Sequence, residues 1–155
     1  MNRTLSVSEW HELSKEGNMI PVRIRLSGYS MNPLIRGYRD YVTVVPIDGI
    51  LSKGDIVLFC EPGTNRYVMH RVWDIQNGKI QIWGDNCKTP DGWFDPEDIW
   101  GKAILIERGK HRICPDPEKG IRWARFWHKA GKAYRLCRRY KRGILRRIKK
   151  QSADE

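Results

Sequence analysis

Short apolar runs rich in β-branched residues dominate the chain between about residues 20 and 108. These runs recur at roughly ten-residue spacing with turn-forming residues between them, a pattern typical of antiparallel strands. The predicted strands cover residues 22–26, 41–45, 55–60, 67–74, 79–83 and 99–107. The pattern therefore predicts a mostly β domain built on an antiparallel sheet.

One of the turns between these strands carries a strong local signal. The pair Asn77-Gly78 separates two apolar runs by two residues, and it favours a tight hairpin because both residues tolerate positive φ. Turn signals at 52–54 (Ser-Lys-Gly), 61–65 (Glu-Pro-Gly-Thr-Asn) and 84–86 (Gly-Asp-Asn) separate other runs.

The N-terminal residues show a helical pattern. Residues 5–17 predict a short helix in which Trp10 and Leu13 share a face. Ser6 or Ser8 could cap its start, and Gly17-Asn18 ends it.

A second helical pattern follows the break at Cys114-Pro-Asp-Pro117. From Ile121 to Lys150, apolar residues recur every three or four positions and Lys or Arg fills most of the rest. This spacing indicates a basic amphipathic helix or a pair of helices. We therefore expect two parts, a β domain over residues 1–118 and a helical tail over residues 119–155.

The charge of the chain is concentrated in this tail. The net charge is +11, yet residues 1–118 hold 15 of the 29 basic residues and 16 of the 18 acidic ones. Residues 119–150 hold the other 14 basic residues and no acidic residue. The basic character therefore describes the tail rather than the domain.

Three interpretations of the tail stay open. It could pack its aromatic stripe on the β domain, bind nucleic acid through phosphate contacts, or lie on an anionic membrane surface. The membrane interpretation is favoured because residues 121–150 contain no acidic residue, unlike an ordinary solvated helix, and place aromatic rings among basic side chains. The expected membrane-surface residues are Trp123, Phe126, Trp127, Arg135 and Arg138.

Some classes of protein are disfavoured by what the sequence lacks. No apolar run approaches the roughly 18 residues of a membrane-spanning helix. Glu9, Glu12 and Glu16 occupy the region where a secretory signal needs an apolar centre. We therefore expect a cytoplasmic or peripheral membrane protein.

The four cysteines, Cys60, Cys87, Cys114 and Cys137, are spread without CxxC spacing. In a chain with no export signal, free thiols are the expected state. No His/Cys cluster has zinc-site spacing, so we predict no metal and no other cofactor.

Polar residues with chemical potential lie in three places. Ser30 is in the turn SGYSMNP, His70 is in the strand run YVMHRV, and Asp85 and Asp91 are in the polar loop GDNCKTPD. Each feature alone is typical of an ordinary turn or strand. A serine hydroxyl becomes a useful nucleophile when a base takes its proton, and histidine can do so at neutral pH.

The order of these motifs resembles that of a known family. The matching pieces are SGYSMNP (27–33), SKGDIVLF (52–59), MHRV (69–72), GDN (84–86) with Asp91 beyond it, and IWGKA (99–103). Together they resemble the type I signal peptidases, in the branch where histidine stands in place of the usual lysine. The resemblance covers about residues 26–106 and implies a signal-peptidase/LexA-like β fold.

The resemblance also implies an activity and a set of roles. The chain would be a serine endopeptidase that removes a leader or signal segment from a peptide or preprotein. Ser30 would be the nucleophile, His70 the general base and Asp91 the acid behind the histidine. Asp85 of the GDN piece would have a supporting role.

The residues around the serine are the candidate substrate-binding residues: Gly28, Tyr29, Met31 and Pro33. Gly28 sits where some family members place a hydroxyl that stabilises the oxyanion. We therefore expect the oxyanion hole to depend on backbone N–H groups, including that of Ser30.

Two other functions stay open. Self-cleaving regulators of the LexA type share this β fold, although they use a serine–lysine pair. A catalytically silent module could instead bind a membrane, or less favourably nucleic acid, through the basic tail.

Overall fold

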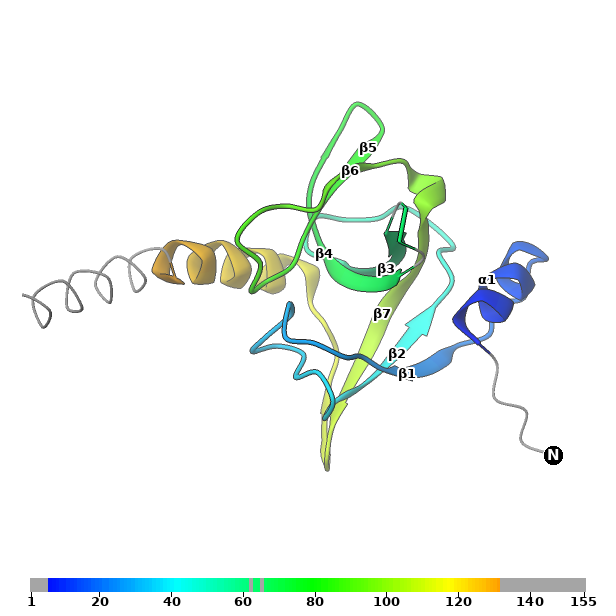
Figure 1. Cartoon of the computed structure of the whole chain (residues 1–155), viewed down its shortest axis with the longest axis horizontal. Helices are drawn as coiled ribbons and strands as arrows, with labels where there is room; N and C mark the ends of the chain where they lie inside the picture. The colour runs from blue at the N-terminus through cyan, green and yellow to red at the C-terminus, as the bar shows by residue number, and fades with distance from the viewer. Residues whose placement is uncertain (1–5, 62, 65, 132–155) are drawn as a thin grey trace, which may run out of the picture. The chain divides into compact units, whose positions relative to one another are not determined.

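Strand β3 (Ile56–Glu61) runs between two apolar layers and is central to the fold. The structure, a computed structural model, describes residues 6–61, 63–64 and 66–131 (Figure 1). Ile56 and Leu58 belong to one hydrophobic cluster, whereas Val57 and Phe59 belong to another. Successive strand residues point to opposite faces, so the unbroken apolar run of β3 supplies both clusters.

The strands form one antiparallel sheet. In the described residues it has eight strands in the order β1-β2-β7-β3-β4-β5-β6, and β8 pairs with β7. The other bounds are β1 Val22–Arg25, β2 Tyr41–Val45, β4 Arg66–Gln76, β5 Lys79–Trp83, β6 Gly92–Phe94, β7 Ile99–Arg108 and β8 His111–Ile113. The mostly β, antiparallel prediction is confirmed.

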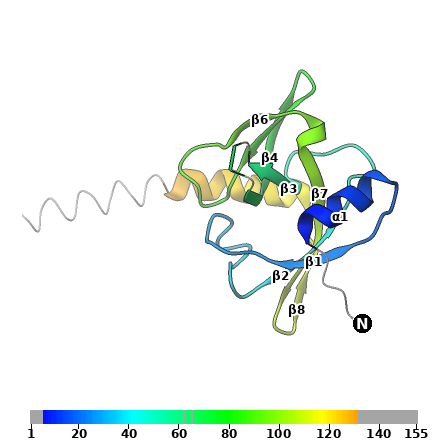
Figure 2. The ribbon, with the colours of Figure 1, turned by 45° about the vertical axis from the view of Figure 1, so that its right-hand side comes forward.

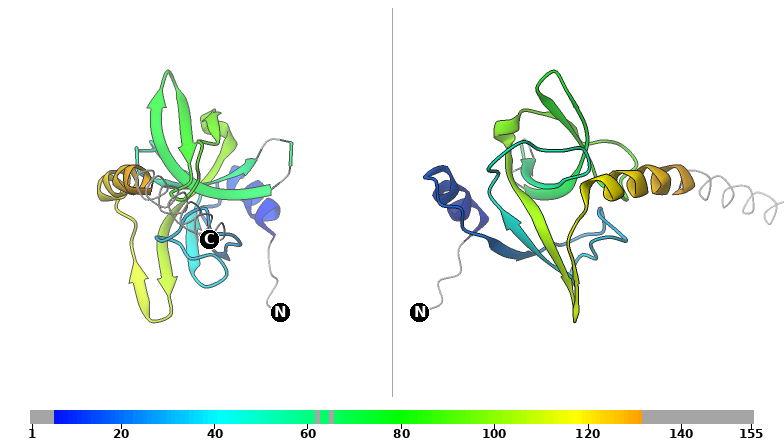
Figure 3. Two further views of the ribbon diagram at one scale, coloured as in Figure 1. Left: turned by 60° about the vertical axis from the view of Figure 1, so that its left-hand side comes forward. Right: turned by 180° about the vertical axis from the view of Figure 1, so that it is seen from behind.

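The β4–β5 hairpin turns at the predicted position. Gln76 pairs with Lys79, and the two residues between them, Asn77 and Gly78, have φ values of 51° and 75°. This hairpin and that of β7 and β8 extend from opposite ends of the sheet (Figures 2 and 3).

Two strands and one short helix were not predicted. Strands β6 and β8 have three residues each, and a 3₁₀ helix covers Pro96–Asp98. The residues of β8 carry little apolar signal: His111 and Arg112 are exposed, and pairing with β7 is what orders them.

Helix α1 (Val7–Lys15) begins with a capping box. The Ser6 hydroxyl accepts from the Glu9 backbone N–H at 3.2 Å, and the Glu9 carboxylate accepts from the Ser6 backbone N–H at 2.8 Å. Trp10 anchors the helix in the core, where its indole N–H donates to the Ile20 carbonyl at 2.7 Å. Of the two predicted caps, Ser6 is therefore the one used.

A further helix covers residues 117–131 and starts before the predicted Ile121. The Asp116 carboxylate accepts from the Lys119 backbone N–H at 3.0 Å and so satisfies one of the free donors at its start. The chain divides into two compact units, residues 1–122 and 123–155. Arg135, Arg138 and Cys137 lie outside the described residues.

Candidate active site

A pocket of about 460 Å³ brings three of the four candidate catalytic residues together. It lies between the turn that follows β1 and the first half of β4. Its lining consists of Leu26, Ser27, Gly28, Tyr29, Ser30, Glu61, Arg66, Tyr67, Val68, Met69, His70 and Asp91. Ser30, His70 and Asp91 thus share one cavity, and Asp85 does not line it.

His70 is held by Asp91. His70 lies on β4 with only 4% of its surface exposed, and its Nδ1 is 2.7 Å from Asp91 Oδ2. The Asp91 backbone N–H donates to the Ile82 carbonyl at 2.9 Å, which fixes the carboxylate relative to β5. A carboxylate on Nδ1 orients the ring and stabilises its cation, leaving Nε2 for proton transfer.

The protonation of His70 is shifted by this environment. Burial disfavours the imidazolium, but the hydrogen bond with Asp91, a weaker one with Cys87 and the charge of Asp91 outweigh it. Together they raise the pKa of His70 to about 9. The imidazole is therefore mainly protonated at neutral pH, whereas a general base acts in its neutral form.

The loop of residues 84–86 holds the backbone of the Ser30 turn. The Asn86 backbone N–H donates to the Ser30 carbonyl at 2.7 Å, and the Asn86 side chain donates to the Tyr29 carbonyl at 3.1 Å. On the other side of the turn, a Cβ at Gly37 would overlap the Gly28 carbonyl, so the two backbones are in direct contact.

The Ser30 hydroxyl and His70 share the pocket without a direct bond. Within the part of the chain that the structure describes, no hydrogen bond joins the two side chains, and Nε2 of His70 faces Cys87 Sγ at 3.9 Å. Catalytic hydrogen bonds are often long before substrate binds. Proton transfer would require Ser30 Oγ to come within reach of Nε2.

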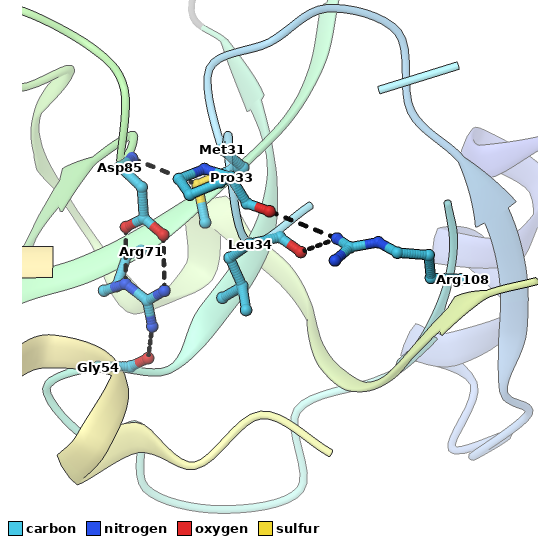
Figure 4. Close-up of polar contacts among 7 residues, drawn as sticks. All are labelled: Met31, Pro33, Leu34, Gly54, Arg71, Asp85 and Arg108. Carbon is cyan, nitrogen blue, oxygen red and sulfur yellow. Dashed lines mark hydrogen bonds and ion pairs between the residues drawn. The ribbon is translucent and has the colours of Figure 1, made fainter. Parts of the chain in front are cut away.

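The residues that follow Ser30 are held by contacts with Asp85 on one side and Arg108 on the other (Figure 4). The sulfur of Met31 accepts from the Asp85 backbone N–H at 3.5 Å, and Arg108 donates to the Leu34 and Pro33 carbonyls at 2.7 and 3.4 Å. These contacts place the residues that follow the serine against the body of the domain.

Two of the four candidate substrate-binding residues do not line the pocket. Met31 is 3% exposed and belongs to a hydrophobic cluster, so its side chain faces the core rather than the pocket. Pro33 contributes its carbonyl to Arg108 instead. Gly28 and Tyr29 do line the pocket, and the Tyr29 side chain is exposed.

Asp85 forms a buried ion pair rather than a contact with the histidine. Its two carboxylate oxygens accept from Arg71 Nε and a terminal nitrogen at 2.8 and 2.7 Å (Figure 4). The other terminal nitrogen of Arg71 donates to the Gly54 carbonyl at 2.8 Å. The pair is almost fully buried, so each charge depends on the other for compensation.

A second ion pair, missed from the sequence, supports the same turn. Arg108 donates to both carboxylate oxygens of Asp40, with a shortest distance of 2.7 Å. Burial favours the neutral carboxyl, but hydrogen bonds from Arg108 and from the Arg36 backbone N–H outweigh it and hold the pKa of Asp40 below its ordinary value. Among the described residues, no group of three His, Cys, Asp or Glu side chains is placed to hold a metal ion.

Replacing Asp85 with Asn tests the buried pair. The variant leaves the Arg71 guanidinium without a compensating carboxylate, and Asp85→Asn should lower the free energy of unfolding by about 3 kcal/mol. Urea denaturation measures the change. The matched control is Glu12→Gln, which removes the carboxylate of the exposed Lys15–Glu12 pair and should leave the midpoint nearly unchanged. Equal midpoints in the two variants would contradict the structural role of Asp85.

The titration of His70 can be followed by NMR of its ring. We expect a midpoint near pH 9, and Asp91→Asn should lower it because the hydrogen bond and the charge are both lost. Since the pKa of folded His70 lies above its ordinary 6.5, its stabilising effect is complete below pH 6.5 and is lost as the pH rises through about 9. A wild-type midpoint at or below 6.5 would show that Asp91 does not hold the cation.

Comparison with known proteins leaves this site to be interpreted from its own geometry. No known protein-family model matches the chain, and no curated protein matches it.

Proposed function

We propose that this chain is a serine endopeptidase of the signal-peptidase type, which removes a leader or signal segment from a peptide or preprotein. One observation carries the proposal: Ser30, His70 and Asp91 line a single pocket in which His70 is bound to Asp91 at 2.7 Å. These are the positions to which the sequence resemblance gives the roles of nucleophile, base and acid.

Each group has a defined part in the proposed reaction. Ser30 Oγ attacks the carbonyl carbon of the scissile peptide bond while Nε2 of His70 takes its proton. Asp91 stays ionised and stabilises the imidazolium, which then protonates the leaving amine. Water activated by the same imidazole hydrolyses the acyl-enzyme. Backbone N–H groups of the turn, including that of Ser30, would stabilise the oxyanion.

Among the described residues, the edge of β4 beside the pocket is unpaired, and this supports an extended peptide substrate. Residues Arg66–His70 pair with β3 on one side, whereas the pairing of β4 with β5 begins at Arg71. The free edge lies along the pocket, so a peptide could add there as a further strand and present its backbone to Ser30. Tyr67 and Val68 would provide the apolar contacts beside it.

The helix at residues 117–131 supports an association with an anionic membrane. Trp123 and Trp127 stack with ring centroids 5.7 Å apart, and Phe126 is 67% exposed. The described part also carries the bases Lys119, Arg122, Arg125 and Lys129. Aromatic side chains interspersed with basic ones are suited to the boundary between lipid headgroups and acyl chains, where the rings enter the membrane and the positive charges bind anionic headgroups. In the described residues, no helix has the length and apolar character needed to cross a membrane.

The peptidase activity should require Ser30. Replacing Ser30 with Ala removes the nucleophile and should reduce cleavage by about a thousandfold or more. The measurement is neo-N-terminal profiling of cells that express the wild type or Ser30→Ala. His70→Ala should behave like Ser30→Ala, and Ser8→Ala, on the exposed side of α1, should behave like the wild type.

Other outcomes of this experiment would favour the alternatives. Identical N-termini in wild-type and Ser30→Ala cells would contradict the proposal and favour a catalytically silent binding module. A Ser30-dependent fragment of the protein itself, detected by intact mass after incubation at raised pH, would favour a self-cleaving regulator.

Membrane association can be measured by vesicle sedimentation. The full chain should bind vesicles that contain phosphatidylglycerol and not vesicles of phosphatidylcholine alone. Trp127→Ala should weaken binding about tenfold because apolar area no longer enters the membrane. Trp93→Ala is the matched control, since Trp93 on β6 is 43% exposed and Trp127 is 40% exposed. Binding to duplex DNA but not to vesicles would replace this proposal with nucleic-acid binding.

A further inference from the structure

The second ring nitrogen of His70 faces a cysteine. Cys87 Sγ lies 3.9 Å from Nε2, and Cys87 is a free, half-buried thiol. Since Asp91 binds Nδ1, Nε2 is the nitrogen that remains to take a proton from Ser30. The thiol therefore lies at the atom that the proposed reaction uses.

The loop between β5 and β6 is shaped to allow this contact. A Cβ at Gly84 would lie 2.6 Å from Cys87 Sγ and 2.8 Å from His70 Nε2, closer than any side chain could be accommodated without a shift. The Cys87 backbone N–H donates to the Gly84 carbonyl at 3.0 Å, and the Cys87 carbonyl accepts from the Trp83 indole N–H at 3.2 Å. These two hydrogen bonds hold the backbone of Cys87 through both its N–H and its carbonyl. The close approach of the Cys87 and His70 side chains to Gly84 explains why glycine stands at that position.

Few other groups around His70 can influence its protonation. Asp91 and Cys87 contact the ring directly, Glu61 and Arg66 lie on the wall of the same pocket, and the Phe59 ring packs at 6.2 Å. Only the first two contribute to the raised pKa of His70. Cys60, the other half-buried thiol among the described residues, lies on β3 and has no hydrogen bond with His70.

We propose that Cys87 is a positioning residue for His70. The Cys87 sulfur holds Nε2 of His70 in the resting site, and this contact is replaced by one with Ser30 when substrate binds. The contact itself is independent of any activity, whereas its consequence for the reaction rests on the proposed peptidase function. Because the sulfur accepts the Nε2–H of the imidazolium, it favours the protonated ring. Cys87 therefore limits how much of the neutral base is present.

Removing the thiol should make the base more available at neutral pH. Each unit by which the pKa of His70 falls increases the neutral fraction at pH 7 up to about tenfold. We expect Cys87→Ala to move the NMR midpoint of His70 to lower pH and to raise kcat/KM at pH 7 about threefold or more. Activity is measured on a peptide that spans a cleavage site found by N-terminal profiling.

Two companion variants separate this role from a merely structural one. Cys60→Ala removes the other half-buried thiol and should change neither the midpoint nor the pH profile. Cys87→Ser restores an acceptor near Nε2 and should return the midpoint part of the way to the wild-type value. It also serves as the test protein if Cys87→Ala folds poorly.

The outcomes distinguish the two proposals. Identical His70 midpoints in wild type, Cys87→Ala and Cys87→Ser would overturn the positioning role, as would a loss of stability with an unmoved midpoint. A shifted midpoint in a protein with no Ser30-dependent cleavage at any pH would sustain the role of Cys87 toward His70 and refute the peptidase proposal. A shifted midpoint with a matching shift in the pH profile supports both.

Discussion

The buried ion pair of Arg71 and Asp85 is the constraint on which the geometry of the site depends. Arg71 follows His70 on β4, and Asp85 precedes Asn86, the residue that binds the backbone of Ser30 and Tyr29. Two charges removed from water are tolerated when each compensates the other. If the loop of residues 84–86 moved away from β4, one of the two charges would stay buried without its partner. A single interaction thus holds β4, which carries His70, and the turn that carries Ser30 in a fixed relative position.

The pair of Asp40 and Arg108 complements this constraint at the far end of the turn. Arg108 neutralises a buried carboxylate and at the same time caps the Pro33 and Leu34 carbonyls. Met31, between the two ion pairs, buries its side chain in the core. The Ser30 turn is therefore fixed by charge at both ends and by apolar packing in the middle. Such preorganisation reduces the entropy lost when reacting groups are aligned.

Much of this architecture could be predicted because its causes are local. Alternating apolar runs specify the long strands, and Asn77-Gly78 specifies its hairpin through positive φ. The rest depends on distant partners. Arg108 binds the carboxylate of Asp40, 68 residues away in the sequence, and no periodic pattern of residues predicts such a pair. Met31 lies next to Ser30 in the chain, yet adjacent side chains in a tight turn point in different directions, so Met31 packs in the core while Ser30 lines the pocket. The contact of Cys87 with Nε2 depends on the missing side chain of Gly84, which a sequence pattern does not reveal.

The protonation of His70 links these structural features to the chemistry. In the proposed reaction, Asp91 would act in two opposite ways on His70 as a general base: it favours the cation and so reduces the neutral fraction, but it would also stabilise the imidazolium formed when Ser30 loses its proton. Cys87 resembles Asp91 in the first effect and differs in the second, because the attacking serine has to take the place of the sulfur at Nε2. The stabilisation from Asp91 therefore persists through the reaction, whereas that from Cys87 is confined to the resting site. A group that stabilises the resting state alone opposes a reaction, so in the proposed peptidase the thiol would restrain the site while the carboxylate would assist it.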